Sequence, residues 1–263
     1  MSADRELEAA SDILWQCWQD NTVIDELPEE LRPVTRADGY AIQAQLMRLT
    51  WLPLFGWKIA ATSLAGQKHI NVDGPLAGRI LTDRVVANGS AITLGANRMR
   101  VAEAEFAFRM GEDLHYRPEA YSQAEVLAAI DTLHPSIEVP DSRFTNYTKV
   151  GAAQLIADNA CADDFMLGPS APADWRKLDL AAHKVVGRVP GRGVMHVGQG
   201  ANVLGGPLIA LTWLVNELSS LRITLKAGEM VTTGTCIVPL PLEVGDEALA
   251  DFGSLGKVSL NFV

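Results

Sequence analysis

Three glutamates and one lysine are the residues whose types and spacing in this sequence best suit chemistry. Glu103 and Glu105 lie two positions apart in residues 101–110, and the apolar Phe106 and Phe108 fall on the other parity. In an extended strand, alternate side chains share a face, so both carboxylates would lie about 7 Å apart along one face. Their oxygens could then converge on one Mg²⁺ or Mn²⁺ at about 2.1 Å. The alternative is a half-solvated strand with two surface glutamates, because charged residues are mostly exposed.

A third acid favours the metal interpretation. Glu138 stands between apolar neighbours in the sequence. A glutamate in such a stretch needs a cation or a tight hydrogen bond. An ion pair with Arg143 is the alternative. Three carboxylates without a His-x-His or cysteine pair favour a hard cation over zinc. We therefore predict that Glu103, Glu105 and Glu138 hold one Mg²⁺ or Mn²⁺.

Lys58 is a further candidate, because it lies in the short apolar run 56–60. Lysine is seldom buried without a partner. In a cleft, its ammonium could bind a substrate carboxylate or transfer protons with a depressed pKa. At a strand edge, it would instead block aggregation. The polar breaks at 158–160 and 233–235 are either turns or loops of a site.

The elements that must position these residues follow an α+β pattern without βαβ alternation. Helical periodicity, caps and prolines predict helices at 4–20, 36–49, 122–133 and 207–218. Short β-rich runs predict strands at 57–60, 78–81, 101–110, 136–139, 185–189, 230–232 and 257–262. Two helices precede the first clear strand. We therefore expect a small helical N-terminal region at 1–55 and a metal-binding catalytic core at 56–263.

Composition excludes several classes of function. The 263 residues are 48% hydrophobic and 21% charged, as in ordinary globular proteins. A net charge of −10 argues against binding to nucleic acid. The apolar run at 204–215 is too short for a membrane span, and the polar, acidic N-terminus is unlike a signal peptide. Three scattered cysteines without a CxxC pair indicate reduced thiols. The expectation is a soluble, cytoplasmic protein.

Taken in order, the motifs resemble one branch of the fumarylacetoacetate hydrolase superfamily, that of the 2-keto-4-pentenoate hydratases and 4-oxalocrotonate decarboxylases. The motifs are Arg36–Gln43, Gly56–Ile59, Val72–Pro75, Glu103–Glu105, Ile137–Arg143, Asp158–Ala160, Thr233–Thr235 and Asp251–Ser259. Each motif is weak, but their order and spacing together are specific and span nearly the whole chain. The resemblance implies a mixed β-sandwich or β-roll core of the superfamily's C-terminal type. It also implies a homo-oligomer, with possible association with a paralogous pathway enzyme.

The same resemblance implies roles for individual residues. The three glutamates would bind Mg²⁺ or Mn²⁺, and Lys58 would be catalytic. Thr235 and Asp158 would contact the substrate. A small 2-oxo acid can chelate a metal through its carboxylate and keto oxygens, and the metal then acts as a Lewis acid. The implied activity is that of a divalent-metal-dependent lyase on a 2-oxo acid or 2-hydroxy-2,4-dienoate in aromatic catabolism.

The reaction type stays open between hydration and its alternatives. Hydration is the family default. Leu76 stands where hydratases commonly carry an aspartate, and this favours decarboxylation of an oxalocrotonate-type diacid if Leu76 lines the substrate site. Hydrolysis of a C–C bond in an acylpyruvate would need a base to activate water, and His134 is the nearby candidate. A non-catalytic partner subunit is the remaining alternative.

Overall fold

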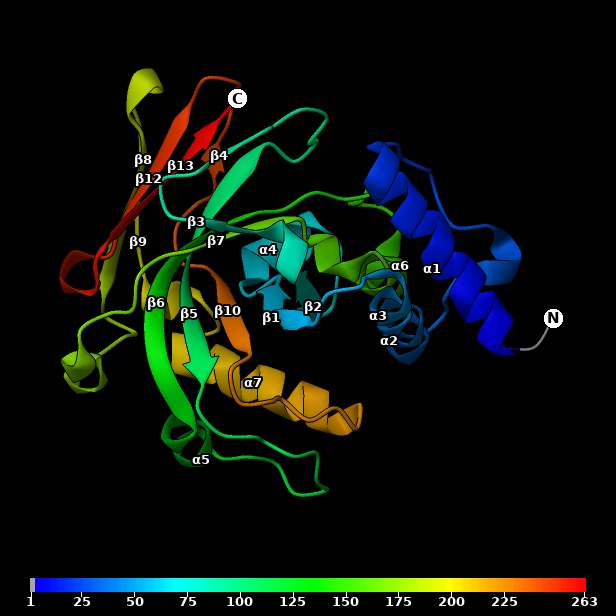
Figure 1. The fold of residues 1–263 in the computed structure, drawn as a ribbon, viewed down its shortest axis with the longest axis horizontal. Coiled ribbons are helices and arrows are strands. Elements are labelled where there is room, and N and C mark those ends of the chain that lie inside the picture. Colours follow the sequence, from blue (N-terminus) through cyan, green and yellow to red (C-terminus); the bar gives the residue numbers. More distant parts are fainter. Residues whose placement is uncertain (1–2) are drawn as a thin grey trace.

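Two curled sheets form the centre of the molecule in the computed structural model, which describes residues 3–263 (Figure 1). The larger sheet contains, in spatial order, β2 (Leu76–Leu81), β1 (Leu54–Ala60), β10 (Met230–Thr235), β5 (Val101–Met110), β6 (Ile130–Val139), β7 (Asp164–Leu167) and β3 (Val85–Ala87), and β11 (Leu240–Pro241) pairs with β5 off this path. The smaller sheet contains β4 (Ala91–Ile92), β13 (Lys257–Phe262), β12 (Glu247–Asp251), β8 (Lys184–Val189) and β9 (Val194–Gln199). Parallel pairs occur in both sheets, so the predicted mixed α+β architecture is confirmed.

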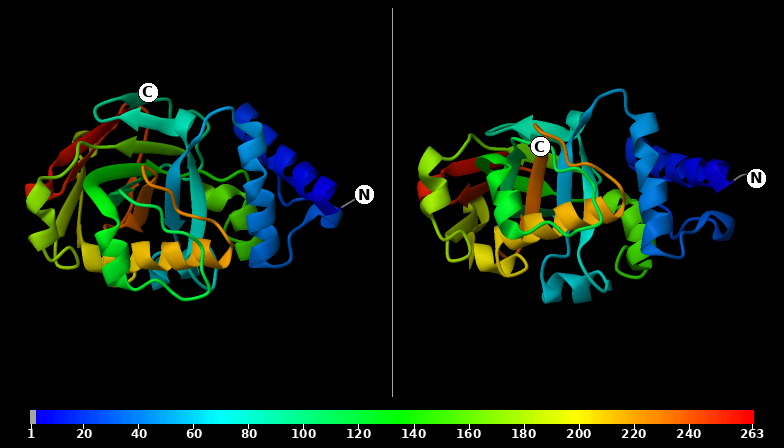
Figure 2. Two further views of the ribbon diagram at one scale, coloured as in Figure 1. Left: turned by 60° about the horizontal axis from the view of Figure 1, so that its bottom comes forward. Right: turned by 90° about the horizontal axis from the view of Figure 1, so that it is seen from below.

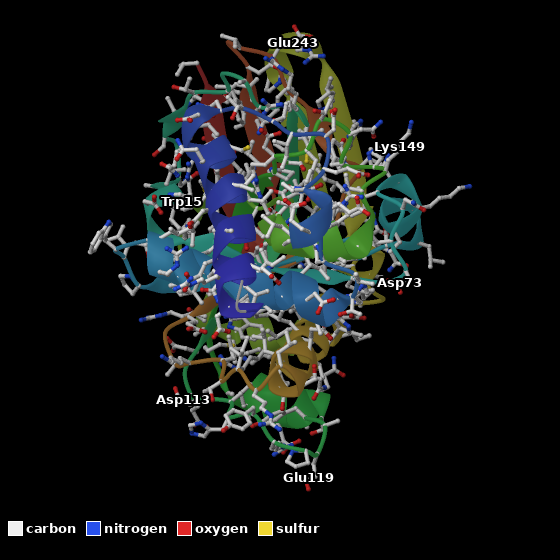
Figure 3. All side chains as sticks on the ribbon, turned by 90° about the vertical axis from the view of Figure 1, so that its right-hand side faces the viewer. Trp15, Asp73, Asp113, Glu119, Lys149 and Glu243 are labelled. Atoms are coloured by element: carbon white, nitrogen blue, oxygen red, sulfur yellow. The ribbon has the colours of Figure 1, made fainter. Side chains whose placement is uncertain are left out.

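The helices lie around the larger sheet and at one end of the molecule (Figure 2). They are α1 (Ala3–Asp20), α2 (Arg36–Ala44), α3 (Leu46–Leu49), α4 (Leu64–His69), α5 (Gln123–Ala128), α6 (Gly151–Ala157) and α7 (Pro207–Ser220). Helix α7 packs against β10, α2 packs against α6, and α1 packs against α2 and α3. Figure 3 looks at the end of the molecule that carries α1 and its partly buried Trp15. No helix in residues 3–263 combines the length and the apolar character needed to cross a bilayer.

The N-terminal helices are bound to the sheet by buried polar contacts as well as by apolar packing. Gln43 of α2 donates from Nε2 to the carbonyl oxygens of Ala77 (2.8 Å) and Ile156 (2.9 Å). The hydroxyl of Tyr40 accepts a hydrogen bond from the backbone N–H of Ala77 at 3.1 Å. These contacts hold α2 against β2, whose neighbour β1 carries Lys58.

Capping residues and hydrophobic periodicity in the sequence predicted most helices and strands. Some of these elements end at other residues than predicted, because strands pair there. Thr35 caps α2 in a capping box with Asp38, as its position predicted. The helix predicted at 122–133 ends at Ala128, because Ile130 already pairs with Met110 in the sheet. Tertiary pairing therefore outweighs the helical propensity of the residues after 128.

Candidate metal centre and substrate cavity

The three glutamates converge in space. Glu103 on β5 lies directly opposite Glu138 on β6, and Glu105 follows two residues later on the same face. One carboxylate oxygen from each residue lies within 4.8 Å of the others. Strand parity predicted the shared face of Glu103 and Glu105, and the convergence with Glu138 is the arrangement expected from its apolar neighbours.

Their surroundings fit a divalent cation. Glu105 Oε2 accepts hydrogen bonds from the Thr232 hydroxyl and from the Gly234 N–H at 2.8 Å. Glu105 Oε1 and both oxygens of Glu138 are buried, and no described residue donates a well-aligned hydrogen bond to them. Lys58 Nζ lies 2.9 Å from Glu138 Oε1 as an ion pair. One ammonium facing three carboxylates leaves negative charge and lone pairs that a cation would satisfy.

The burial and mutual proximity of the three glutamates raise their pKa values. Burial raises the pKa of Glu103 to about 7; the charge of Glu138 adds to this rise and Lys58 opposes it. Burial raises the pKa of Glu105 well above its usual range, and the two neighbouring carboxylates raise it further. Burial also raises the pKa of Glu138, against the opposing effect of Lys58. Protons therefore compete with a cation for this site near neutral pH.

Lys58 lies inside the sheet, since β1 is flanked by β2 and β10. The residue is 2% exposed, so the strand-edge alternative is wrong. Burial favours its neutral amine, but the charges of Glu138 and Glu103 outweigh burial and raise the pKa of Lys58. Gly78 on β2 leaves room for its stem, because a Cβ there would lie 3.0 Å from Lys58 Cδ.

A left-handed turn orients the ammonium of Lys58. Asn159, Ala160 and Cys161 all have positive φ, at 54°, 52° and 60°. The Asn159 side chain accepts from the N–H of Arg79 (2.6 Å) and donates to its carbonyl (2.8 Å), which ties the turn to β2. The Ala160 carbonyl then accepts a hydrogen bond from Lys58 Nζ at 3.0 Å. Such strained backbone is typical of functional sites.

Asp158 has a structural partner instead of the predicted contact with substrate. It is 1% exposed and forms a buried ion pair with Arg143. It also accepts a hydrogen bond from the Ser142 hydroxyl at 2.6 Å. Asp158 does not reach the cavity, which corrects its predicted contact with the substrate. Arg143 pairs with Asp158, so the alternative in which Arg143 pairs with Glu138 is wrong.

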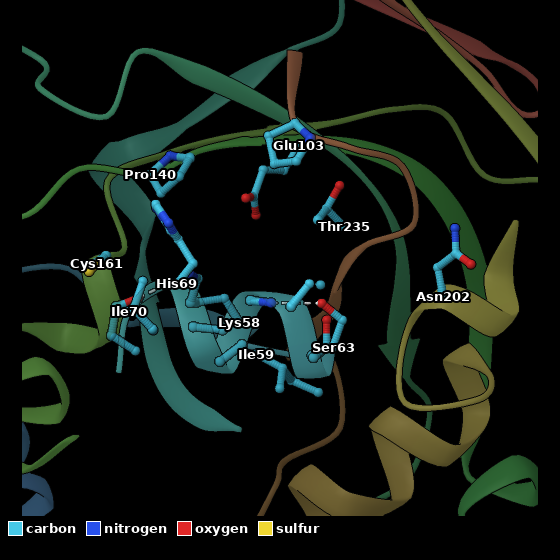
Figure 4. A pocket seen from close by; sticks show the side chains of 18 of the residues that line it. Lys58, Ile59, Ser63, His69, Ile70, Glu103, Pro140, Cys161, Asn202 and Thr235 are labelled. Carbon is cyan, nitrogen blue, oxygen red and sulfur yellow. Dashed lines mark hydrogen bonds between the residues drawn. The ribbon is translucent and has the colours of Figure 1, made fainter. Parts of the chain in front are cut away.

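A cavity of about 490 Å³ opens beside the glutamates (Figure 4). Among the predicted site residues, Lys58, Glu103 and Thr235 line it. Glu103 and Thr235 enter from one side and Lys58 from the other. His69, Cys161 and Asn202 also line the cavity, and sequence reasoning missed all three because they carry no recognisable spacing.

Two further candidate residues do not line the cavity. Leu76 is fully buried in the apolar core, on β2 opposite Ala60, and does not line the cavity. His134 also lies outside the cavity, and its ring nitrogens contact the Thr132 hydroxyl and the Gly168 carbonyl, each at 2.9 Å. Leu76 therefore gives no support to decarboxylation, and His134 gives none to hydrolysis.

Comparisons with known proteins find similar chains of known activity. The chain is 32% identical to 2-keto-4-pentenoate hydratase 1 from Dechloromonas aromatica (strain RCB), over 97% of this chain and 96% of the relative. It is 30% identical to 4-oxalocrotonate decarboxylase from Pseudomonas sp. (strain CF600), over 91% and 90% of the two chains. A solved structure of 4-oxalocrotonate decarboxylase from Pseudomonas putida G7, complexed with magnesium and adipate, matches 100% of this chain and 99% of its own with a TM-score of 0.89 and 26% identity. No protein-family model matches the chain.

Proposed function

The chain belongs to the family of 2-keto-4-pentenoate hydratases and 4-oxalocrotonate decarboxylases, and we propose that it is a divalent-metal-dependent hydratase of 2-hydroxy-2,4-dienoates and the corresponding 2-oxo acids in aromatic catabolism. One observation carries the proposal: the carboxylates of Glu103, Glu105 and Glu138 converge beside Lys58 at the wall of a cavity, and buried oxygens of Glu105 and Glu138 lack a well-aligned hydrogen bond. The relatives that are hydratases support hydration as the reaction. A metal complex of a similar structure supports Mg²⁺ as the cofactor, with Mn²⁺ as an equivalent.

In the proposed site, Glu103, Glu105 and Glu138 would hold the cation. A divalent cation supplies Lewis-acid polarisation of the substrate's carboxylate and keto oxygens when it is bound. Lys58 carries protons at Nζ beside the glutamates, and its orientation is fixed by Glu138 and the Ala160 carbonyl. Lys58 would hold or move a proton while the substrate ketonises. The apolar cavity walls would limit competing water.

Decarboxylation is the second candidate. Its support is the 4-oxalocrotonate decarboxylase relative and the similar solved structure. The same metal and the same lysine could serve both reactions, so the glutamates do not discriminate between them. Hydrolysis of acylpyruvates loses its only suggested base with the placement of His134 outside the cavity.

We further propose that residues 1–55 act as a support for a catalytic core at 56–263, which the contacts from α2 to β2 favour. Homo-oligomerisation is proposed on the resemblance and on large apolar side chains exposed in the N-terminal region, such as Trp51, which is fully exposed, and Val34, which is 87% exposed. A cytoplasmic location is proposed on the free, buried state of all three cysteines.

The proposed function is tested with purified protein, Mg²⁺ or Mn²⁺, and two substrates. 2-Hydroxypenta-2,4-dienoate and 4-oxalocrotonate are supplied separately, and loss of ultraviolet absorbance is followed together with release of CO₂. Hydration of the dienoate, abolished by chelator and by Glu103→Ala, is expected. Release of CO₂ from the diacid without hydration of the dienoate would select decarboxylation. Turnover that continues without metal would contradict both.

A further inference from the structure

The cavity extends well beyond the glutamates, and its far walls are apolar. A volume of about 490 Å³ is within the range of pockets that enclose whole small molecules, about 300–1,000 Å³. The carboxylate and keto oxygens of a 2-oxo acid would fill only the part beside Glu103. Apolar side chains dominate the remaining walls, among them Ile59, Ile70, Met99, Pro140, Ile237, Val238 and Pro239.

One of these side chains is uncovered. Val238 is 66% exposed although it faces the cavity, whereas Ile237 beside it is 4% exposed. Contact with an apolar ligand would remove this surface from water, which is favourable in proportion to the area buried.

Two of the polar side chains on the walls help to hold the walls in place. The Thr235 hydroxyl donates to the Ile237 carbonyl at 2.9 Å, and Asn202 Nδ2 donates to the Cys236 carbonyl at 2.9 Å. These bonds hold the loop that carries Val238. Thr235 and Asn202 therefore shape the wall.

The walls also offer little positive charge to a second carboxylate. Among residues 3–263, no arginine lines the cavity, and Lys58 is its single lysine, already paired with Glu138. His69 is the remaining basic side chain; it lies across the cavity from Asn202 in Figure 4 and contacts the edge of the Tyr147 ring at 6.2 Å between centroids. A second carboxylate in this apolar space of a protein with net charge −10 would be poorly compensated.

From this lining we propose that the site selects 2-oxo monoacids with an extended apolar tail, which lies against Val238, Ile237 and Met99, and that it discriminates against dicarboxylates. The inference rests on the proposed function for the anchoring of the 2-oxo acid end. It adds the class of side chain that the substrate carries. It also predicts that the diacid reaction of the second candidate function is disfavoured in this chain by its cavity walls.

Binding of unreactive saturated acids tests the inference without turnover. Dissociation constants of 2-oxobutanoate, 2-oxohexanoate, 2-oxooctanoate and 2-oxoadipate are measured by calorimetry with the Mg²⁺-loaded protein. Each added methylene should tighten binding about two- to fourfold, as expected for partial to full burial. 2-Oxoadipate should bind at least about tenfold more weakly than 2-oxohexanoate, which has the same chain length, because its second carboxylate lacks a partner.

A matched pair of variants locates the effect. Val238→Arg places a cation on the cavity wall and should weaken 2-oxohexanoate and strengthen 2-oxoadipate. Val244→Arg is the control, because Val244 is similarly exposed, at 62%, and lies outside the cavity. It should leave both affinities unchanged.

The possible failures can be told apart. If no 2-oxo acid binds in the presence of Mg²⁺, the 2-oxo acid end is not held at the glutamates. The proposed function and the inference are then both wrong. If the short acid binds but affinity does not increase with the apolar tail, only the inference is overturned. Tight binding of 2-oxoadipate that is lost in His69→Gln would also overturn it, because His69 would then be a receptor for a second carboxylate.

Discussion

Replacing Glu103 by glutamine should stabilise the metal-free protein at neutral pH while it removes the response to metal. Glu103 faces Glu138 directly across two strands, and like charges in that arrangement are destabilising. Burial and the charge of Glu138 raise the pKa of Glu103 to about 7 from its usual 4.5. A folded-state pKa above the unfolded one means that the carboxyl contributes stability below pH 4.5, and that this contribution is lost as the pH rises through 7.

The size of the effect follows from the two pKa values. A difference of about 2.5, at 1.36 kcal/mol each, gives about 3 kcal/mol lost by pH 8. Glu103 is partly exposed to the cavity, and solvent screening reduces this to about 2 kcal/mol. Glu103→Gln lacks this loss, so its unfolding midpoint in chelator at pH 8 should exceed that of the wild type by about 4–8 °C. At pH 4.5 the two proteins should unfold at similar temperatures.

Thermal unfolding from pH 4.5 to 8, in chelator and in Mg²⁺, measures both halves of the prediction. Mg²⁺ should stabilise the wild type increasingly as the pH rises, because deprotonated carboxylates bind it, and should have little effect on Glu103→Gln. Glu247→Gln is the control, since Glu247 is an exposed strand residue outside the cluster. A Glu103→Gln protein that is no more stable than the wild type at pH 8 would refute the electrostatic reasoning.

Three further variants test the assigned roles. Lys58→Met should abolish turnover. It should also destabilise the metal-free protein by about 3–5 kcal/mol, because Glu138 loses its buried partner. Denaturant unfolding with and without Mg²⁺ should show that the metal restores part of this stability. Asp158→Ala should cost a similar amount, about 3–5 kcal/mol, by stranding Arg143, yet a protein that stays folded should keep its affinity for 2-oxo acids in calorimetry. Leu76→Asp should destabilise by about 4 kcal/mol or more in unfolding assays, since it buries a charge in the apolar core, and should not redirect substrate preference.

The convergence of the three glutamates could be predicted from sequence because it depends mainly on simple rules of strand geometry. Strand parity alone places Glu103 and Glu105 on one face. The apolar neighbours of Glu138 indicate a buried strand, and Ile137 and Val139 are each 1% exposed. Antiparallel pairing of two long consecutive strands is a common connection, and it brings Glu138 opposite Glu103.

Leu76 and Asp158 could not be placed from sequence, because each lies next to a residue of the site without facing the cavity. Leu76 pairs with Ala60, which lines the cavity, but its own side chain enters the core. Asp158 precedes Asn159 and Ala160, which fix Lys58, but it turns toward Arg143. A motif gives the position of a residue along the chain. The direction of its side chain depends on turns such as the left-handed turn at Asn159–Cys161.

The pairing of Lys58 with Glu138 also shows why strand order matters to the chemistry. β10 and β5 lie between β1 and β6, so at about 4.8 Å per strand a flat sheet would separate β1 from β6 by about 14 Å. Side chains stand roughly perpendicular to a flat sheet, so contact at 2.9 Å indicates that the sheet curls around the cluster. The register between β10 and β5 shifts after Thr232, as at a β-bulge, and Gly234 has a φ of 96° there. A Cβ at Gly234 would lie 2.1 Å from the Thr62 hydroxyl oxygen, so glycine lets β10 bend and bring its N–H to Glu105. The curvature that assembles the metal site is thus encoded partly in a strand that contributes no carboxylate to it.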